Sequence, residues 1–383
     1  MAVLIIFQNG SVDDGFQFRK VMPEVHRFAA KSGRGFLFPT KGHSLAPVMS
    51  RMMASMLFPG DSNTMFSGPD WPRGYLTALG AGLAPDPSRT WAVLALTHLR
   101  RHQDRLVFVQ GMTVPVAESE TRALVESLRD PFADLGWTIH GMVGQEAILS
   151  TSMECPATVA SLGDIGGRSL HQVLPSGAGA GRLLQLLTTG QLILARSGIN
   201  QDRMARGSLT LNTPWIDGVG KGVVLSEQHQ HVGTRGFCFS DDPVGTGLAR
   251  MAGWKILGRT GEAPMAVDVS EQGAWPIDRI VQAARLGPVL VHCSVTSADH
   301  LRRIGHDSVL KLSAALAVAR LGLLLLAEGL MGRYHENTED PALIEWGYSQ
   351  GRQLSSKQWF WNRRTWGEGP AMALKQGREF WLT

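Results

Sequence analysis

The sequence predicts an α/β protein built on a mainly parallel sheet with helices on both of its faces. Short apolar runs alternate along the chain with longer amphipathic segments, and such strand–helix alternation is typical of a parallel sheet covered on both sides. Glycine is also frequent, at 44 of 383 residues, as expected where many tight turns connect strands to helices.

The apolar runs predict strands and the amphipathic segments predict helices. The predicted strands are Ala2–Phe7, Trp91–Thr97, Arg105–Val109, Val223–Leu225, Gly236–Ser240, Val289–His292 and Leu321–Ala327. The predicted helices are Phe18–Lys31, Glu118–Leu135, Ala178–Arg196, Gly245–Ala252, Pro276–Leu286 and Asp307–Arg320.

The composition is that of a globular protein, with 44% hydrophobic and 18% charged residues. The formal net charge is +4, and no basic run is long enough to form a stripe for nucleic acid, so we expect no nucleic-acid partner. The three cysteines, Cys155, Cys238 and Cys293, are widely spaced. An odd number without a metal-binding pair predicts a reducing compartment.

Neither the N-terminal residues nor the most apolar stretch of the chain indicates a membrane protein. The N-terminal residues have no basic region and no small-residue cleavage site, so they are typical of a buried first strand. The most apolar stretch, residues 312–332, contains Arg320 and Glu328, which favours a helix followed by a buried strand over a membrane span. We therefore expect a cytoplasmic protein that does not enter a membrane.

Two changes in composition divide the chain. Linker-like stretches at residues 84–88 and 175–181 are rich in Pro, Gly and Ser, and the segment between them is a candidate inserted domain. The last stretch, 346–383, holds five of the eleven tryptophans: Trp346, Trp359, Trp361, Trp366 and Trp381. This tail either packs on the domain surface or forms a contact surface for a protein partner, because Trp and Arg are enriched at interface centres.

Three motif stretches lie in a specific order. The first is Arg73-Gly-Tyr-Leu-Thr-Ala-Leu-Gly-Ala-Gly82. The second is Asn200-Gln-Asp-Arg203, followed by Gly207, Leu211-Asn212-Thr-Pro-Trp215 and Gly218-Val-Gly220. The third is His335-Glu-Asn-Thr-Glu-Asp-Pro341. Together they resemble the archaeal-type, cofactor-independent phosphoglycerate mutases over most of residues 1–345, and the tail is not covered.

The resemblance implies an alkaline-phosphatase-like fold with a discontinuous core. The core would comprise residues 1–85 and 181–345, the inserted lid 86–180, and the tail 346–383. Relatives transfer a phosphoryl group between the hydroxyls of a glycerate through a serine phosphoenzyme, which requires two divalent cations close together. The matching positions make Asn200, Arg203, Asn212 and His171 candidate substrate-binding residues. Asn200, Arg203 and Asn212 have a structural interpretation as well, in which they fix turns and a helix C-terminus.

The positions that should carry the chemistry depart from the family. Its first metal-binding Asp-Gly is replaced by Asn9-Gly10, with Asp13 and Asp14 close by. Its nucleophile lies in Gly-Ser-Asp-x-Ala-His, a motif that is missing here, so that Ser44 and Ser50 are the nearest candidate nucleophiles.

The metal-ligand groups that come later in the chain also depart from the family pattern. Val291-His292 is kept, but the Asp-x-x-Gly-His that should follow is absent, and Asp299 and His306 replace it only if the loop is rebuilt. The Asp-His after the last core strand is Glu328-Gly329, whereas His335 is retained. The lid arginines that grip substrate anions in the family are also missing from their pattern, although Arg100, Arg101 and Arg105 lie nearby.

Two hypotheses follow. In the first, the protein lacks mutase activity, needs no cofactor, and has a binding or regulatory role towards a protein partner or a small phosphorylated or carboxylate ligand. In the second, it is an active phosphoglycerate mutase or a related phosphoester enzyme with a rearranged metal site for Mn²⁺, Zn²⁺ or Mg²⁺. The ligands of that second site would be Asp13, Asp14, Asp299, His306, Glu328 and His335.

Overall fold

The computed structural model describes residues 3–9, 34–40, 72–109, 116–222, 236–257, 275–287, 289–295, 311–312, 315, 321–328, 344–349 and 352–353. These residues form a mixed α/β fold. The chain divides into two compact units. The first comprises residues 1–65, 226–263 and 271–383, and the second comprises 66–225 and 264–270.

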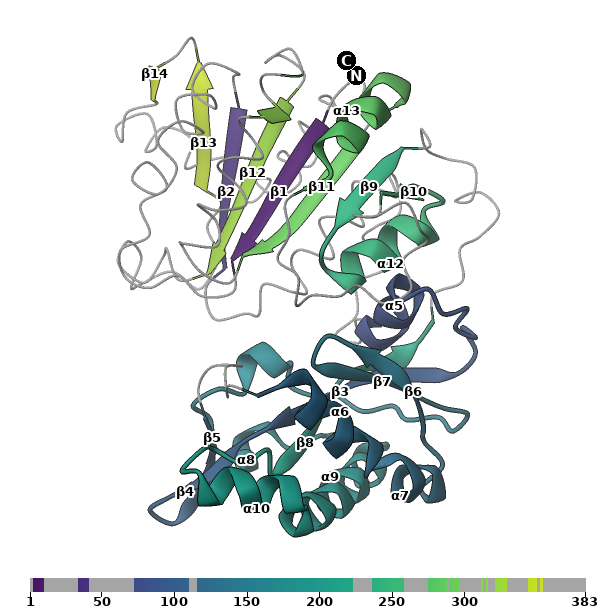
Figure 1. Ribbon diagram of the computed structural model, residues 1–383, viewed down its shortest axis with the longest axis vertical. Coiled ribbons are helices and arrows are strands. Elements are labelled where there is room, and N and C mark those ends of the chain that lie inside the picture. Colours follow the sequence, from purple (N-terminus) through teal and green to yellow (C-terminus); the bar gives the residue numbers. More distant parts are fainter. Residues whose placement is uncertain are drawn as a thin grey trace. The chain divides into compact units, whose positions relative to one another are not determined.

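The first unit contains an eight-stranded sheet in the order β10-β9-β11-β1-β12-β2-β13-β14, seen at the top of Figure 1. From β10 to β2 the neighbouring strands pair parallel, whereas β13 pairs antiparallel with both β2 and β14. The strands are β1 (Val3–Asn9), β2 (Arg34–Thr40), β9 (Phe237–Ser240), β10 (Lys255–Ile256), β11 (Val289–Val295), β12 (Leu321–Glu328), β13 (Ile344–Ser349) and β14 (Arg352–Gln353). The helices are α12 (Pro243–Met251) and α13 (Ile277–Leu286).

The central strands form because their sequences are apolar without alternation. A parallel strand buried on both faces has no polar side, so it reads as a continuous apolar run. In β11, Val289, Leu290 and Val291 are all fully buried. The predicted strands near β1, β9, β11 and β12 are confirmed within a few residues, whereas β2, β10, β13 and β14 were not predicted. The predictions Phe18–Lys31 and Val223–Leu225 lie outside the described residues.

The predicted tail does not begin at residue 346. Strand β13 contains Trp346, which lies opposite Gly35 of β2 in the core sheet, and β14 follows it. Backbone pairing therefore extends the first unit to at least Gln353.

The second unit is built on a four-stranded antiparallel sheet in the order β6-β7-β3-β8, with a separate two-stranded hairpin, β4–β5. The core of this unit lies between the sheet and the helices, and it includes Leu94, Leu149 and Leu186. The strands are β3 (Thr90–Thr97), β4 (Leu99–His102), β5 (Arg105–Phe108), β6 (Thr138–Val143), β7 (Glu146–Thr151) and β8 (Thr213–Lys221). The helices are α5 (Arg73–Gly80), α6 (Glu118–Glu126), α7 (Arg129–Asp134), α8 (Leu170–Val173), α9 (Ala180–Arg196), α10 (Gly198–Ala205) and the 3-10 helix η1 (Leu162–Asp164).

The second unit extends beyond the predicted inserted segment, 86–180, at both ends. Strand β8 pairs with β3, and α5 packs on both strands. Helix α9 packs so closely on β8 that a Cβ on Gly190 would come within 2.5 Å of the Pro214 ring. Residues before 86 and after 180 therefore share one core with the predicted segment, which explains why the linker-like stretches are poor guides to its limits.

One local prediction was also wrong. The helix predicted over Glu118–Leu135 is divided into α6 and α7. The Gly218-Val-Gly220 motif lies inside strand β8, where the pairing with β3 shifts register and Gly218 adopts φ +59°. A β-bulge of this kind uses a glycine in the left-handed region, so the same residue type signals a turn or a bulge.

Candidate functional site

The candidate site lies at the carboxyl edge of the parallel strands in the first unit. In open α/β sheets, ligands bind in the crevice outside this edge. Strand β1 lies between β11 and β12, and Asn9 at its end is in register with Val295 and Ala327. Glu328, the next residue of β12, is in register with Thr40 at the end of β2. The fold thus brings two of the sequence-predicted metal positions, Asn9 and Glu328, to neighbouring strands at one edge.

Most other predicted site residues lie outside the described residues. These are Asp13, Asp14, Ser44, Ser50, Asp299, His306 and His335. Among the residues that the structure does describe, no group of three or more His, Cys, Asp or Glu side chains is arranged to hold a metal ion.

A buried serine–histidine pair lies at the same edge. Ser240 ends β9 and is in register with His292 of β11, and Ser240 Oγ lies 2.9 Å from His292 Nδ1. His292 is fully buried and Ser240 is 9% exposed. The hydroxyl also donates to the Asp242 carbonyl at 3.0 Å and accepts from the Asp242 N–H at 3.1 Å. These contacts hold the hydroxyl in place at the end of β9.

Helix α12 follows β9, so its N-terminus lies at this edge. The carboxylate of Asp242 occupies that helix N-terminus. Asp242 accepts from the backbone N–H groups of Val244 and Gly245 at 3.2 and 3.3 Å. A helix N-terminus attracts phosphate through such free N–H groups and the helix dipole. Asp242 satisfies them as an N-cap, so this helix end is closed to an anionic ligand.

Neither described cysteine environment favours reactivity. Cys238 in β9 is fully buried, and this burial raises the pKa of its thiol to about 12. Burial also raises the pKa of Cys155. Thiols held protonated in this way are structural.

The resemblance motif Asn-x-x-Arg serves structural bonds. Asn200 is 3% exposed, and its Nδ2 donates to the carbonyls of Leu194 and Leu211, at 2.9 Å each. Its Oδ1 accepts from the Leu211 N–H at 2.8 Å. The amide therefore joins the C-terminal part of α9 to the segment leading into β8, and its donors and acceptor are engaged by backbone.

Arg203 is equally engaged. It is 3% exposed, and its Nε donates to the Leu209 carbonyl at 2.8 Å. Its Nη1 contacts Glu120 Oε2 at 2.5 Å, which connects α10 to α6. The more exposed Arg206 contacts the other oxygen of Glu120 at 2.8 Å, and this hydrogen bond is the main cause that lowers the pKa of Glu120.

Asn212 behaves like one residue of an added strand. Its Oδ1 accepts from the Leu99 N–H and its Nδ2 donates to the Leu99 carbonyl, both at 2.8 Å. The remaining candidate substrate residue, His171, lies exposed on α8. The structure therefore does not bring Asn200, Arg203, Asn212 and His171 together as one ligand site.

The Arg73 stretch has a structural explanation too. Arg73 Nη2 donates to both carboxylate oxygens of Glu146 at 2.8 and 2.7 Å, and Nη1 donates to Asp217 at 3.3 Å. A Cβ on Gly74 would lie 2.3 Å from the backbone nitrogen of Ala92. Helix α5 can therefore approach β3 only because this residue is glycine.

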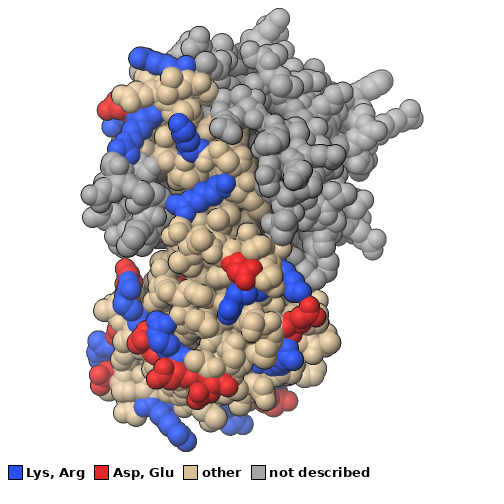
Figure 2. Space-filling model, turned by 90° about the vertical axis from the view of Figure 1, so that its right-hand side faces the viewer, with Lys and Arg blue, Asp and Glu red and all other residues tan. Residues whose placement is uncertain are grey.

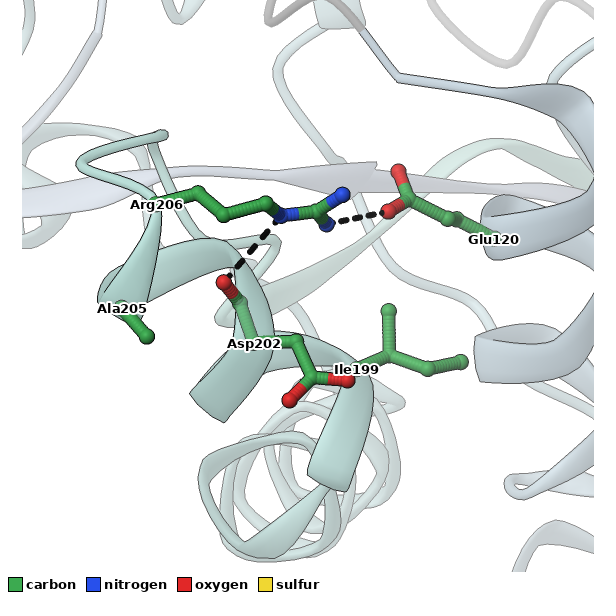
Figure 3. Close-up of a pocket in the computed structure, with 5 residues that line it drawn as sticks. All are labelled: Glu120, Ile199, Asp202, Ala205 and Arg206. Atoms are coloured by element: carbon green, nitrogen blue, oxygen red, sulfur yellow. Dashed lines mark hydrogen bonds and ion pairs between the residues drawn. The ribbon is translucent and has the colours of Figure 1, made fainter.

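A shallow depression between α6 and α10 is lined by Glu120, Ile199, Asp202, Ala205 and Arg206 (Figure 3). Arg206 and Glu120 are engaged with each other, and Arg206 also bonds the backbone carbonyl of Asp202. The arginine is thus already neutralised by the protein, so the depression is a groove in the packing of α6 on α10.

Comparisons with known proteins give a partial relationship. No family model matches the sequence. A probable 2,3-bisphosphoglycerate-independent phosphoglycerate mutase from Geobacter sulfurreducens is 28% identical over 150 residues, which is 38% of this chain and 38% of that protein. The matched stretch is thus well under half of the relative's length, and over it the chain is homologous to a phosphoglycerate mutase.

One solved structure shows the fold. The PH0037 protein from Pyrococcus horikoshii superposes with a TM-score of 0.52 at 14% identity, covering 84% of this chain and 81% of that one. The cofactor-independent phosphoglycerate mutase from Thermoplasma acidophilum gives a TM-score of 0.42 at 15% identity, covering 84% of this chain and 86% of that one.

Within the described ranges, no helix is long and apolar enough to cross a membrane.

Proposed function

We propose that this is a phosphoglycerate-mutase-like cytoplasmic protein that has lost the mutase reaction and serves in binding or regulation. The observation that carries the proposal is Asn9. It stands at the end of the central strand β1, between the ends of β11 and β12, at the edge where the metals of an active relative would be held.

Two adjacent divalent cations repel each other unless negative ligands compensate their charge. The strand-end residues Asn9, Val295 and Ala327 supply no charge, and Glu328 supplies one carboxylate. Taken alone, these described strand-end residues do not fit a pair of Mn²⁺, Zn²⁺ or Mg²⁺ ions, which favour several carboxylate or imidazole ligands each. We therefore derive no catalytic step through a metal pair.

The retained motifs support the same proposal. Asn200, Arg203 and Asn212 are engaged with backbone or with Glu120, so selection for the fold alone accounts for them. A protein that keeps these residues and lacks the ligand residues keeps the scaffold of the core and of an inserted lid, the arrangement of the alkaline-phosphatase-like enzymes, without their reaction.

The binding role has two proposed ligands. A small phosphorylated or carboxylate molecule would bind at the carboxyl edge of the sheet, away from the N-terminus of α12, which Asp242 closes. A protein partner would bind the tail beyond Gln353, whose tryptophans and arginines have the composition of an interface centre.

A mutase assay tests the proposal. The purified full-length protein is mixed with 3-phosphoglycerate and an excess of Mn²⁺, Zn²⁺ or Mg²⁺ in turn, and 2-phosphoglycerate is measured. We expect no turnover above the rate without protein. Turnover that stays unchanged in Glu328→Gln and in His335→Ala would indicate a contaminant, whereas turnover lost in either variant but kept in Gln201→Ala would overturn the proposal.

One observation favours the second candidate, an enzyme with a rearranged metal site. Glu328 keeps a carboxylate at a strand end that neighbours β1. In this case Glu328, His335, Asp299, His306 and Asp13 would hold one or two ions, and Ser50 or Ser44 would carry the phosphoryl group. Metal that binds to the wild type and is lost on His335→Ala separates this candidate from the first.

A further inference from the structure

The β4–β5 hairpin of the second unit concentrates exposed basic side chains. Arg100, Arg101, His102 and Arg105 are all exposed. The hairpin lies apart from the four-stranded sheet and projects from the second unit (Figure 1). It is also independent of the candidate site, which belongs to the first unit.

Three of these side chains share one face. Arg105 lies opposite His102 in the antiparallel register, and opposite residues point to the same side. Arg100 is two residues before His102 on the same strand, so it points to that side as well. The adjacent pair Leu99–Phe108 points to the other side, where both residues are buried in the core. The cationic face is therefore turned away from the core.

The charges of this face are not compensated within the described part of the chain. Elsewhere in the unit, basic side chains pair with carboxylates, as in Arg122–Glu118 at 2.6 Å and Lys221–Glu154 at 2.7 Å. On the face drawn in Figure 2, blue and red side chains of this unit accordingly lie next to one another. Arg100 and Arg105 form no such pair with any residue that the structure describes. Like charges on one face of a hairpin destabilise it, so folding alone does not account for them.

The chemistry of the face indicates its partner. Guanidinium groups bind carboxylates and phosphates through paired hydrogen bonds. The hairpin is exposed from Arg100 to Leu106, around its tip, so it offers a surface rather than a cavity that would enclose a small molecule. Its exposed residues include no Phe, Tyr or Trp on which a nucleic-acid base could stack.

We propose that the β4–β5 hairpin is a docking surface for an acidic segment of a partner protein. Its carboxylates bind Arg100 and Arg105 on the outward face. This proposal does not depend on the proposed function, because an active enzyme and an inactive one would carry the same surface.

Fluorescence anisotropy with a labelled polyglutamate peptide tests the docking surface on the full-length protein at about 150 mM salt, where distant charges are screened. The test variants are Arg105→Glu and the double variant Arg100→Glu/Arg105→Glu. The matched control is Arg196→Glu, because Arg196 is exposed on α9 and has no ion-pair partner among the described residues. Each variant's melting temperature is compared with the wild type, so that misfolded variants are recognised.

We expect the double variant to bind roughly tenfold more weakly and the control to change by less than about twofold. Equal weakening by Arg196→Glu would mean that net charge alone controls binding, and would overturn the proposal. So would unchanged binding in the double variant, or no binding by the wild type. A labelled oligothymidylate that binds the wild type more tightly than polyglutamate, and is lost in the same variants, would replace the acidic protein by a nucleic acid.

Discussion

Arg73 lies directly against Gly218, where an added Cβ would come within 2.3 Å of the arginine's own Cβ. Gly218 also adopts φ +59° at the bulge of β8. This contact allows Arg73 to reach Glu146 and Asp217 from the start of α5. Two of the three resemblance stretches meet at this point, and they meet for a structural reason.

Gly218→Ala should therefore destabilise the protein by about 3 kcal/mol, because it combines backbone strain with a steric clash. Gly207→Ala is the matched control. Gly207 also has a positive φ, +70°, but no atom lies within 4 Å of its added Cβ, so it should cost only about 1 kcal/mol. The measurement is the free energy of unfolding in urea. Equal losses for the two variants would show that the Arg73 contact is unimportant.

Asn200→Ala should lower the free energy of unfolding by about 3 kcal/mol. The substitution leaves the Leu194 carbonyl and both backbone groups of Leu211 without their partner in a buried setting. Gln201→Ala, on the exposed side of the same helix, should change it by less than about 0.5 kcal/mol. If Asn200→Ala kept full stability and lost binding of a phosphorylated ligand, the residue would be a ligand contact after all.

The stability should also depend on pH through His140. Its ring stacks on Trp91 with centroids 4.9 Å apart, and its Nε2 lies 2.7 Å from Ser150 Oγ. Desolvation, followed by the positive charges of Arg89 and Arg129, lowers the pKa of His140 below its usual value of 6.5. Below pH 6.5 the unfolded chain therefore binds a proton at His140 more readily than the folded chain does. The contribution of His140 to stability is complete above pH 6.5 and falls as the pH falls below that value.

Thermal unfolding at pH 8 and pH 5 measures this effect. The wild type should lose more stability over this interval than His140→Gln, which cannot titrate there. Identical losses in the two proteins would assign the pH dependence to other groups, such as the carboxylates that titrate at lower pH.

The predicted contact surface for a partner lies in the residues beyond β14. Deleting residues 354–383 should leave the melting temperature nearly unchanged if the Trp359–Trp366 segment is a contact surface for a partner. Deleting residues 344–383 is the control, and it should lower the melting temperature strongly because it removes β13 from its pairing with β2. A comparable fall for both deletions would mean that the last residues are part of the fold.

The sequence predicted three strands inside the parallel part of the sheet. The apolar runs of β1, β11 and β12 each lie between two other strands, a position in which strands are typically continuous apolar runs, so composition alone identifies them. Strand β8 was not predicted, because Gly218 and Gly220 interrupt its apolar pattern, and only its pairing with β3 shows that Gly218 lies at a bulge. Periodicity cannot separate a glycine in a turn from a glycine at a bulge.

The candidate site was harder to predict than the fold. Asn9 and Glu328 were identified at strand ends, but their proximity depends on strand order, with β12 next to β1. The Ser240–His292 contact joins residues on strands that are far apart in the sequence, and no local pattern marks it. The structural role of Asn200 required knowing which backbone groups lie within reach of its amide.

The metal content of the purified full-length protein, measured per chain after exchange into metal-free buffer, tests the central claim most directly. The claim, which rests on the resemblance, is that Asn9 and Gly329 stand where the mutases have an acidic and an imidazole ligand and leave no site for two cations. We predict far less than one Mn²⁺, Zn²⁺ or Mg²⁺ per chain, and a higher content in Asn9→Asp/Gly329→His, which restores both ligands. Two tightly bound ions per wild-type chain, lost in His335→Ala, would contradict the account and show that the metal site persists in a rearranged form.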